Sequence, residues 1–82
     1  MTVIQSYVWH NGKRYFVSTI ERSCSAQTEV PIRYNETIAW ESPVDQARGK
    51  IVFMDDDIAG SIDKHIAMCK RIYENGAEVL NG

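Results

Sequence analysis

Asn11-Gly12 stands between two stretches rich in β-branched and aromatic residues, Val3–Trp9 and Lys13–Ile20. Asn-Gly in this position is the strongest short-range signal for a β-hairpin, because both central residues of a type I′ turn need a positive φ. A two-residue turn also fixes the register of the two strands, and it places Tyr7 opposite Phe16. The chain is therefore expected to begin with an antiparallel pair of strands.

This register divides the predicted hairpin into two faces that both carry large apolar side chains. One face holds Tyr7, Trp9, Arg14 and Phe16. The other face holds Ile4, Val8, Tyr15 and Val17, with Ser6 and Thr19. Apolar area on both faces has to be covered, either by another layer of the same chain or by a partner.

Two further strands are predicted after the hairpin. The stretch Glu21–Glu29 is small and polar, and indicates a loop or the frayed end of the second strand. Arg33–Glu41 alternates in strand fashion, with Trp40 on one side and Ala39 on the other, and Lys50–Met54 is a short apolar run. The acidic triplet Asp55–Asp57 is expected to end that last strand.

The stretch Ser61–Asn75 has the periodicity of an amphipathic helix. Ser61 is its expected N-cap, and Gly76 is suited to the left-handed position after its end. Five residues of its apolar arc are predicted to face the sheet: Ile62, Ile66, Cys69, Ile72 and Tyr73. One polar residue, His65, lies inside the same arc.

The predicted fold is α+β: an antiparallel sheet of about four strands, with the N-terminal β-hairpin first and one C-terminal helix packed on one face. With 82 residues, the chain is expected to form a single small α+β domain spanning residues 1–82.

Composition and charge limit the classes of function. The formal net charge of −2 provides no basic field for nucleic acid. No stretch approaches the length of apolar sequence that a membrane span needs, and the N-terminal segment lacks the pattern of a signal peptide. The expectation is a cytoplasmic protein that does not enter a membrane.

A catalytic or metal site has two possible sources in this sequence. His65 and Cys69 are one helical turn apart, but no third group stands at a recognisable spacing, so a core histidine bonded to the sheet is favoured. The Asp55–Asp57 segment does not follow the EF-hand pattern, and Asp55, Asp57 and His65 remain only weak metal candidates. Cys24 and Cys69 form neither a disulfide framework nor a metal motif. No catalytic residue and no cofactor are predicted.

The favoured function is a non-catalytic protein-interaction module that forms a homodimer through an exposed sheet face, with Tyr7, Trp9, Arg14 and Phe16 as the interaction residues. An unidentified protein could take the place of the second copy. One alternative is a small enzyme or metal site around His65, Cys69 and Asp55–Asp57. Another is single-stranded nucleic-acid binding by the aromatic hairpin face, which the acidic balance of charge disfavours.

Overall fold

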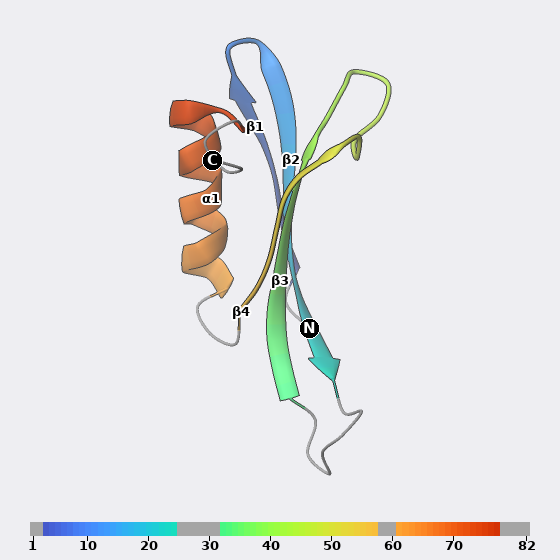
Figure 1. Cartoon of the computed structure of the whole chain (residues 1–82), viewed down its shortest axis with the longest axis vertical. Helices are drawn as coiled ribbons and strands as arrows, with labels where there is room; N and C mark the ends of the chain where they lie inside the picture. Colours follow the sequence, from blue (N-terminus) through green and yellow to red (C-terminus); the bar gives the residue numbers. More distant parts are fainter. Residues whose placement is uncertain (1–2, 25–31, 58–60, 78–82) are drawn as a thin grey trace.

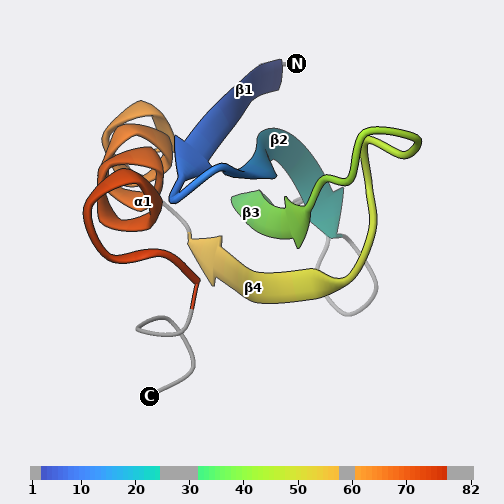
Figure 2. The ribbon, with the colours of Figure 1, turned by 90° about the horizontal axis from the view of Figure 1, so that it is seen from above.

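The sheet and the helix of this chain form two layers. The computed structural model describes residues 3–24, 32–57 and 61–77. The elements are, in chain order, β1 (Val3–His10), β2 (Lys13–Cys24), β3 (Ile32–Glu41), β4 (Ile51–Asp57) and α1 (Ser61–Asn75). The strands form one antiparallel sheet in the order β1-β2-β3-β4 (Figure 1). α1 packs on one face, mainly against β1 and β2 (Figure 2). The predicted α+β fold is confirmed.

The β1–β2 hairpin has the predicted turn and register. Asn11 has a φ of 50° and Gly12 a φ of 77°, so both central residues lie in the left-handed region that a type I′ turn requires. Tyr7 pairs with Phe16, and the register continues without a shift along the whole of β1. The two predicted hairpin faces are therefore the two faces of the sheet.

The strands are longer than expected at the end opposite the hairpin turn. β2 continues to Cys24. β4 runs through the acidic triplet to Asp57. The prediction that the triplet stops the strand after Met54 is therefore wrong. The backbone of Asp55 pairs with that of Thr37, because β3 extends beyond the apolar part of β4 and offers it further partners. β4 is also an edge strand, where charged residues are tolerated.

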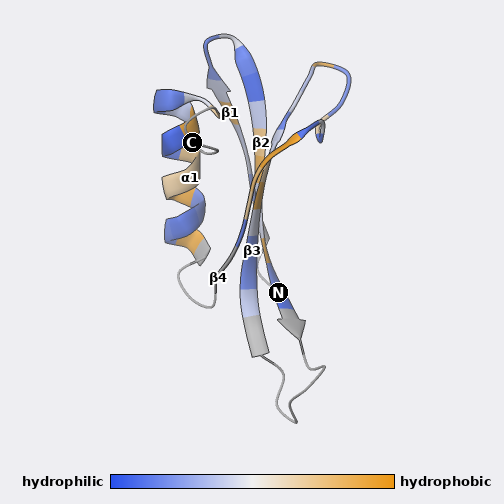
Figure 3. Cartoon of the chain, in the orientation of Figure 1, coloured by the Kyte–Doolittle hydropathy of each residue, from blue (hydrophilic) through white to orange (hydrophobic). Residues whose placement is uncertain are grey.

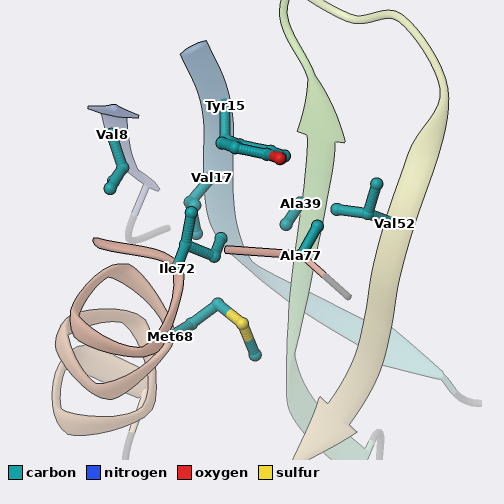
Figure 4. Close-up of a cluster of buried hydrophobic side chains, with 8 residues drawn as sticks. All are labelled: Val8, Tyr15, Val17, Ala39, Val52, Met68, Ile72 and Ala77. Atoms are coloured by element: carbon teal, nitrogen blue, oxygen red, sulfur yellow. The ribbon is translucent and has the colours of Figure 1, made fainter. Parts of the chain in front are cut away.

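The hydrophobic core fills the space between the sheet and the helix (Figure 4). Its side chains come from all four strands, from α1 and from Ala77, which follows α1. They are Val8, Tyr15, Val17, Ala39, Val52, Met68, Ile72 and Ala77. β4 lies at an edge of the sheet, and its hydrophobic part, orange in Figure 3, precedes its acidic end. Gly76, with a φ of 71°, turns the chain after α1 and lets Ala77 reach this core.

The predicted orientation of the helix is wrong for three residues. The exposed fraction is 55% for Ile62, 59% for Ile66 and 69% for Tyr73. The apolar arc is about 160° wide at 100° per residue, which is broader than the strip of one helix that a sheet covers. Burial follows the edge of the arc that contains His65 and Ile72. His65, on this edge, is hydrogen-bonded to hydroxyl groups of the sheet.

Candidate interaction surface

The sheet face opposite α1 carries a row of aromatic side chains. Tyr7, Phe16 and Trp40 stand side by side on β1, β2 and β3, because Phe16 pairs with both of the others. The ring centroids of Tyr7 and Phe16 are 5.1 Å apart, and those of Phe16 and Trp40 are 5.6 Å apart. Trp9 extends the row along β1, with its ring centroid 6.3 Å from that of Tyr7. Such offset and tilted arrangements are the favourable geometry for aromatic pairs.

Two arginines lie over these rings. The guanidinium carbon of Arg14 is 4.8 Å from the centroid of Tyr7. That of Arg48 is 5.1 Å from the centroid of Trp40 and 5.5 Å from that of Phe16. Within the described residues, neither guanidinium forms an ion pair with a carboxylate. We call the surface formed by Tyr7, Trp9, Arg14, Phe16, Trp40 and Arg48 the aromatic face.

The β3–β4 connection holds the side chain of Arg14 in place. Arg14 Nε donates to the carbonyl oxygen and to Oγ of Ser42, at 3.1 Å each, and Nη2 donates to the carbonyl of Pro43 at 2.9 Å. The amide of Gly49 donates to the carbonyl of Glu41, which closes the connection. These bonds fix a side chain that would otherwise be flexible, so the surface is ordered before any partner binds.

Water reaches a large part of this face. Phe16 is buried beneath its neighbours, but Tyr7 and Trp9 are each about half exposed, and so are two residues of β4, Ile51 and Met54. The exposed apolar surface therefore extends from β1 to β4. No other element that the structure describes covers it, since α1 lies on the opposite side of the sheet (Figure 2).

Sequence reasoning brought together part of this surface and missed the rest. Tyr7, Trp9, Arg14 and Phe16 lie together as the hairpin register requires. Trp40 and Arg48 were not connected to them. The alternation in β3 placed Trp40 on one side of its strand, but no short turn links β3 to β2, and the pairing could not be assigned.

A buried polar group lies on the other face, between the sheet and α1. The two ring nitrogens of His65 are hydrogen-bonded to hydroxyl groups: Nε2 to Ser6 at 2.8 Å and Nδ1 to Thr19 at 2.9 Å. Thr19 is in turn bonded to Thr37 at 2.8 Å. Burial lowers the pKa of His65 below its usual value. With both nitrogens occupied and the ring buried, His65 is the core histidine that bonds across to the sheet.

Cys69, one turn after His65, is not poised as a nucleophile. Burial raises the pKa of its thiol, and a hydrogen bond with Ser6 opposes this effect only in part. A catalytic cysteine needs the opposite, a lowered pKa that makes the thiolate available at neutral pH. The pair His65 and Cys69 therefore packs the helix onto β1.

Within the acidic segment, the structure describes the side chain of Asp55. Asp55 is exposed and lines a hollow together with Lys64 and Arg71, two residues of α1. The side chain of Asp57 lies outside the described part of the chain. Among the side chains that the structure describes, no three of His, Cys, Asp or Glu come together in a way that could hold a metal ion.

Comparisons of the chain with protein-family models, with curated proteins and with solved structures found no match. Within the described residues, α1 is too short and too polar to cross a membrane. The aromatic face is therefore the feature of the chain that bears most directly on function.

Proposed function

We propose that the chain is a non-catalytic interaction module that forms a homodimer through its aromatic face. The observation that carries this proposal is the continuous row of Tyr7, Phe16 and Trp40 on a sheet face that no other described element covers, with exposed apolar side chains at both ends of the row. Trp, Tyr and Arg are the residue types that contribute most to binding at protein interfaces.

A second copy of the chain is the partner that we propose for this face. Two sheets pack face to face at about 10 Å, with apolar side chains from both inner faces between them. A two-fold arrangement would cover the same patch on both copies and needs no other protein. Arg14 and Arg48 already stack on rings, so their guanidinium groups can enter such an interface without losing a carboxylate partner.

Sedimentation velocity across a concentration series tests this function. Trp9→Ser and Met54→Lys remove or charge exposed side chains of the aromatic face and its β4 margin. Each is expected to weaken dimerisation by roughly 30-fold or more, the effect of losing an important contact residue. Ala67→Lys, on an exposed part of α1, is the matched control and should leave the dimer intact. A wild-type chain that stays monomeric at hundreds of micromolar would contradict the proposal.

The arginines favour one other function, the binding of single-stranded nucleic acid. Aromatic side chains that stack bases, together with cations not committed to carboxylates, are the components of such sites. The net charge of −2 opposes it. Titration of the Trp fluorescence with short oligonucleotides at two salt concentrations decides between the functions, because nucleic-acid binding would quench Trp40 and weaken steeply with salt.

We further propose that the module acts in the cytoplasm. Cys69 is a free thiol, and a reducing compartment keeps such thiols unmodified. Detection of peptides of this protein in fractionated cells tests the location, because a cytoplasmic protein is expected in the cytosolic fraction.

A further inference from the structure

The edge strand β1 lacks the residue types that usually prevent pairing with another strand. β1 is the first strand in the sheet order, and within the described residues no other strand pairs with its outer side. Its sequence, VIQSYVWH, contains no Lys, Arg, Asp, Glu or Pro. These are the residues with which proteins usually prevent edge strands from associating. The opposite edge, β4, ends in three aspartates and contains a register shift. The two edges therefore differ in their capacity to accept another strand.

α1 carries an apolar stripe beside this unprotected edge. Ile62, Ile66, Cys69 and Tyr73 follow the 4-3-4 spacing of residues that face a second helix. Three of them are more than half exposed, and Cys69 is partly buried beside Ser6 of β1. We call these four residues the helix stripe. The sheet of the same chain does not cover the helix stripe. The stripe therefore has the residue spacing of a helix–helix contact, but no second helix is described against it.

The helix stripe is symmetric about its middle. When a second, antiparallel α1 lies alongside, Ile62 meets the Tyr73 of the other copy, and Ile66 meets the other Cys69. Reversing the order of the stripe reproduces the same spacing, so one two-fold axis through its midpoint satisfies all four contacts. If the second α1 ran parallel to the first, each residue of the stripe would instead lie level with its own copy, and these pairs would not form.

The same axis passes through the middle of β1. His65 is bonded to Ser6, and the carbonyl of Tyr73 accepts a hydrogen bond from Nδ1 of His10, so helix and strand run side by side in the same direction. The eight-residue step from His65 to Tyr73 along the helix rises about 12 Å, and the four-residue step from Ser6 to His10 along the strand rises about 13 Å. The two elements therefore advance together over this distance. The midpoint of the helix stripe then lies at the level of Tyr7.

The backbone of Tyr7 suits a position on that axis. In a hairpin closed by a two-residue turn, the pair next to the turn is hydrogen-bonded and the pairs then alternate. By this count Tyr7 belongs to a pair not bonded to β2, and its N–H and C=O groups point away from the sheet. Two copies of Tyr7 can therefore exchange both hydrogen bonds across an antiparallel β1–β1 pair.

The distance between the helices also fits. α1 lies over β1 and β2, so pairing of two β1 strands would separate the two helix axes by about two strand spacings, roughly 9–10 Å. Packed helices stand about 8–10 Å apart. Strand pairing and helix packing can thus form together without moving either layer.

Charge complementarity favours the same arrangement. Asp63 and Lys70 lie on the solvent side of the helix stripe, seven residues apart. In an antiparallel pair centred on the stripe, Asp63 of each copy lies two residues, or about 3 Å along the helix axis, from the level of the other copy's Lys70, which is within reach of the long lysine side chain. The resulting pairs are of opposite charge on both sides of the axis.

We infer that a second copy of this chain docks on the edge formed by β1 and the helix stripe. The product is a continuous eight-stranded sheet with two antiparallel helices on one side. The contact is about 26 Å long, from the length of β1, and about 20 Å deep, from one sheet and one helix layer. It buries on the order of 1,000 Å² in total, the size that a specific interface requires. It leaves the aromatic face free, so edge and face contacts together would close a four-copy sandwich.

Sedimentation velocity of two charged variants separates this interface from the proposed function. Ile66→Lys charges the helix stripe, and Met54→Lys charges the face of the sheet near the opposite edge. Ile66→Lys is expected to raise the dissociation constant of the edge dimer at least tenfold, as burial of an unpaired charge does. Ala67→Lys carries the same charge on another side of α1 and should have no effect.

The possible results distinguish between the edge interface and the face interface. A wild-type tetramer that either variant converts to a dimer supports both interfaces. A dimer lost with Ile66→Lys and kept with Met54→Lys supports the edge alone and removes the proposed face dimer. A dimer that Ile66→Lys leaves unchanged overturns the inference, and so does a wild-type monomer at hundreds of micromolar.

Disulfide trapping tests the register of the helices. One variant carries Cys24→Ser and keeps Cys69, and a second carries Cys24→Ser, Cys69→Ser and Ile66→Cys. After mixing and mild oxidation, the inferred register predicts that the heterodimer linked between positions 66 and 69 exceeds both homodimers, as measured by mass spectrometry. The second variant with Ala67→Cys in place of Ile66→Cys is the control. Equal yields from position 66 and position 67 would overturn the register.

Discussion

Ser6 and Thr19 place two hydroxyl groups on the sheet face that α1 covers, and they determine which side of the helix is buried. Thr19 is almost completely buried, and a buried hydroxyl without a partner is unfavourable. His65 is bonded to both groups. If Ile66 faced the sheet instead, these hydroxyl groups would lose that partner. A single polar residue within an apolar arc therefore fixes the rotation of α1.

The unfolding free energy is expected to fall as the pH drops below about 6.5, the pKa of an unperturbed histidine. Burial lowers the pKa of folded His65, so the unfolded chain binds a proton at a pH where the folded chain does not. The loss therefore begins at the unfolded pKa and continues down to the folded one. Chemical denaturation from pH 7.5 to 5 measures it, with His65→Gln as the comparison. An equal slope in both proteins would show that other groups cause the dependence.

At the scale of elements, the pairing of the hairpin could be predicted more fully than the rotation of the helix. Asn11-Gly12 specifies both the turn type and the pairing, and every predicted β1–β2 pair is present. The rotation of α1 depended on contacts with Ser6 and Thr19, two residues distant in sequence whose hydroxyl groups carry no periodic signal. The length of β4 depended on the length of β3, which the composition of Asp55–Asp57 does not reveal.

Two alanine substitutions in α1 are expected to differ widely. Ile72→Ala should lower the unfolding free energy by about 2–5 kcal/mol, because Ile72 is fully buried and its loss leaves a cavity. Ile66→Ala should cost less than about 0.5 kcal/mol in the monomer, since Ile66 is mostly exposed. Urea denaturation at low protein concentration measures both. A larger loss from Ile66→Ala would mean that the helix is rotated differently.

Two glycine substitutions separate backbone strain from a steric contact between elements. Gly12 and Gly76 both have a positive φ, so alanine at either is expected to cost about 1–2 kcal/mol. A Cβ at Gly12 meets no atom within 4 Å, but at Gly76 it would lie 2.7 Å from Cδ2 of His10. Gly76→Ala should therefore be the more destabilising change. Equal losses on denaturation would show that the end of α1 does not press against β1.

At the scale of the whole molecule, apolar surface is distributed unevenly around a small core. α1 covers one face of the sheet, while Tyr7 and Trp9 of the aromatic face and Ile62, Ile66 and Tyr73 of the helix stripe are about half exposed or more. A chain of 82 residues can bury only about 60–65% of its unfolded surface, so its stability is limited. Association of folded copies would bury the remaining apolar surface and add to that stability.

The melting temperature is therefore expected to depend on protein concentration. Association binds only the folded state, so a tenfold rise in concentration adds about 0.7 kcal/mol for each chain of a dimer. In a domain of this size, 1 kcal/mol shifts the melting temperature by about 4–8 °C, which gives roughly 3–6 °C for each tenfold rise. Calorimetry between ten and several hundred micromolar measures the shift. A variant with both Met54→Lys and Ile66→Lys should melt at one temperature throughout this range, because neither the face nor the edge can then associate. A wild-type melting temperature that is equally independent of concentration would mean that the exposed apolar surface does not bring copies of this chain together.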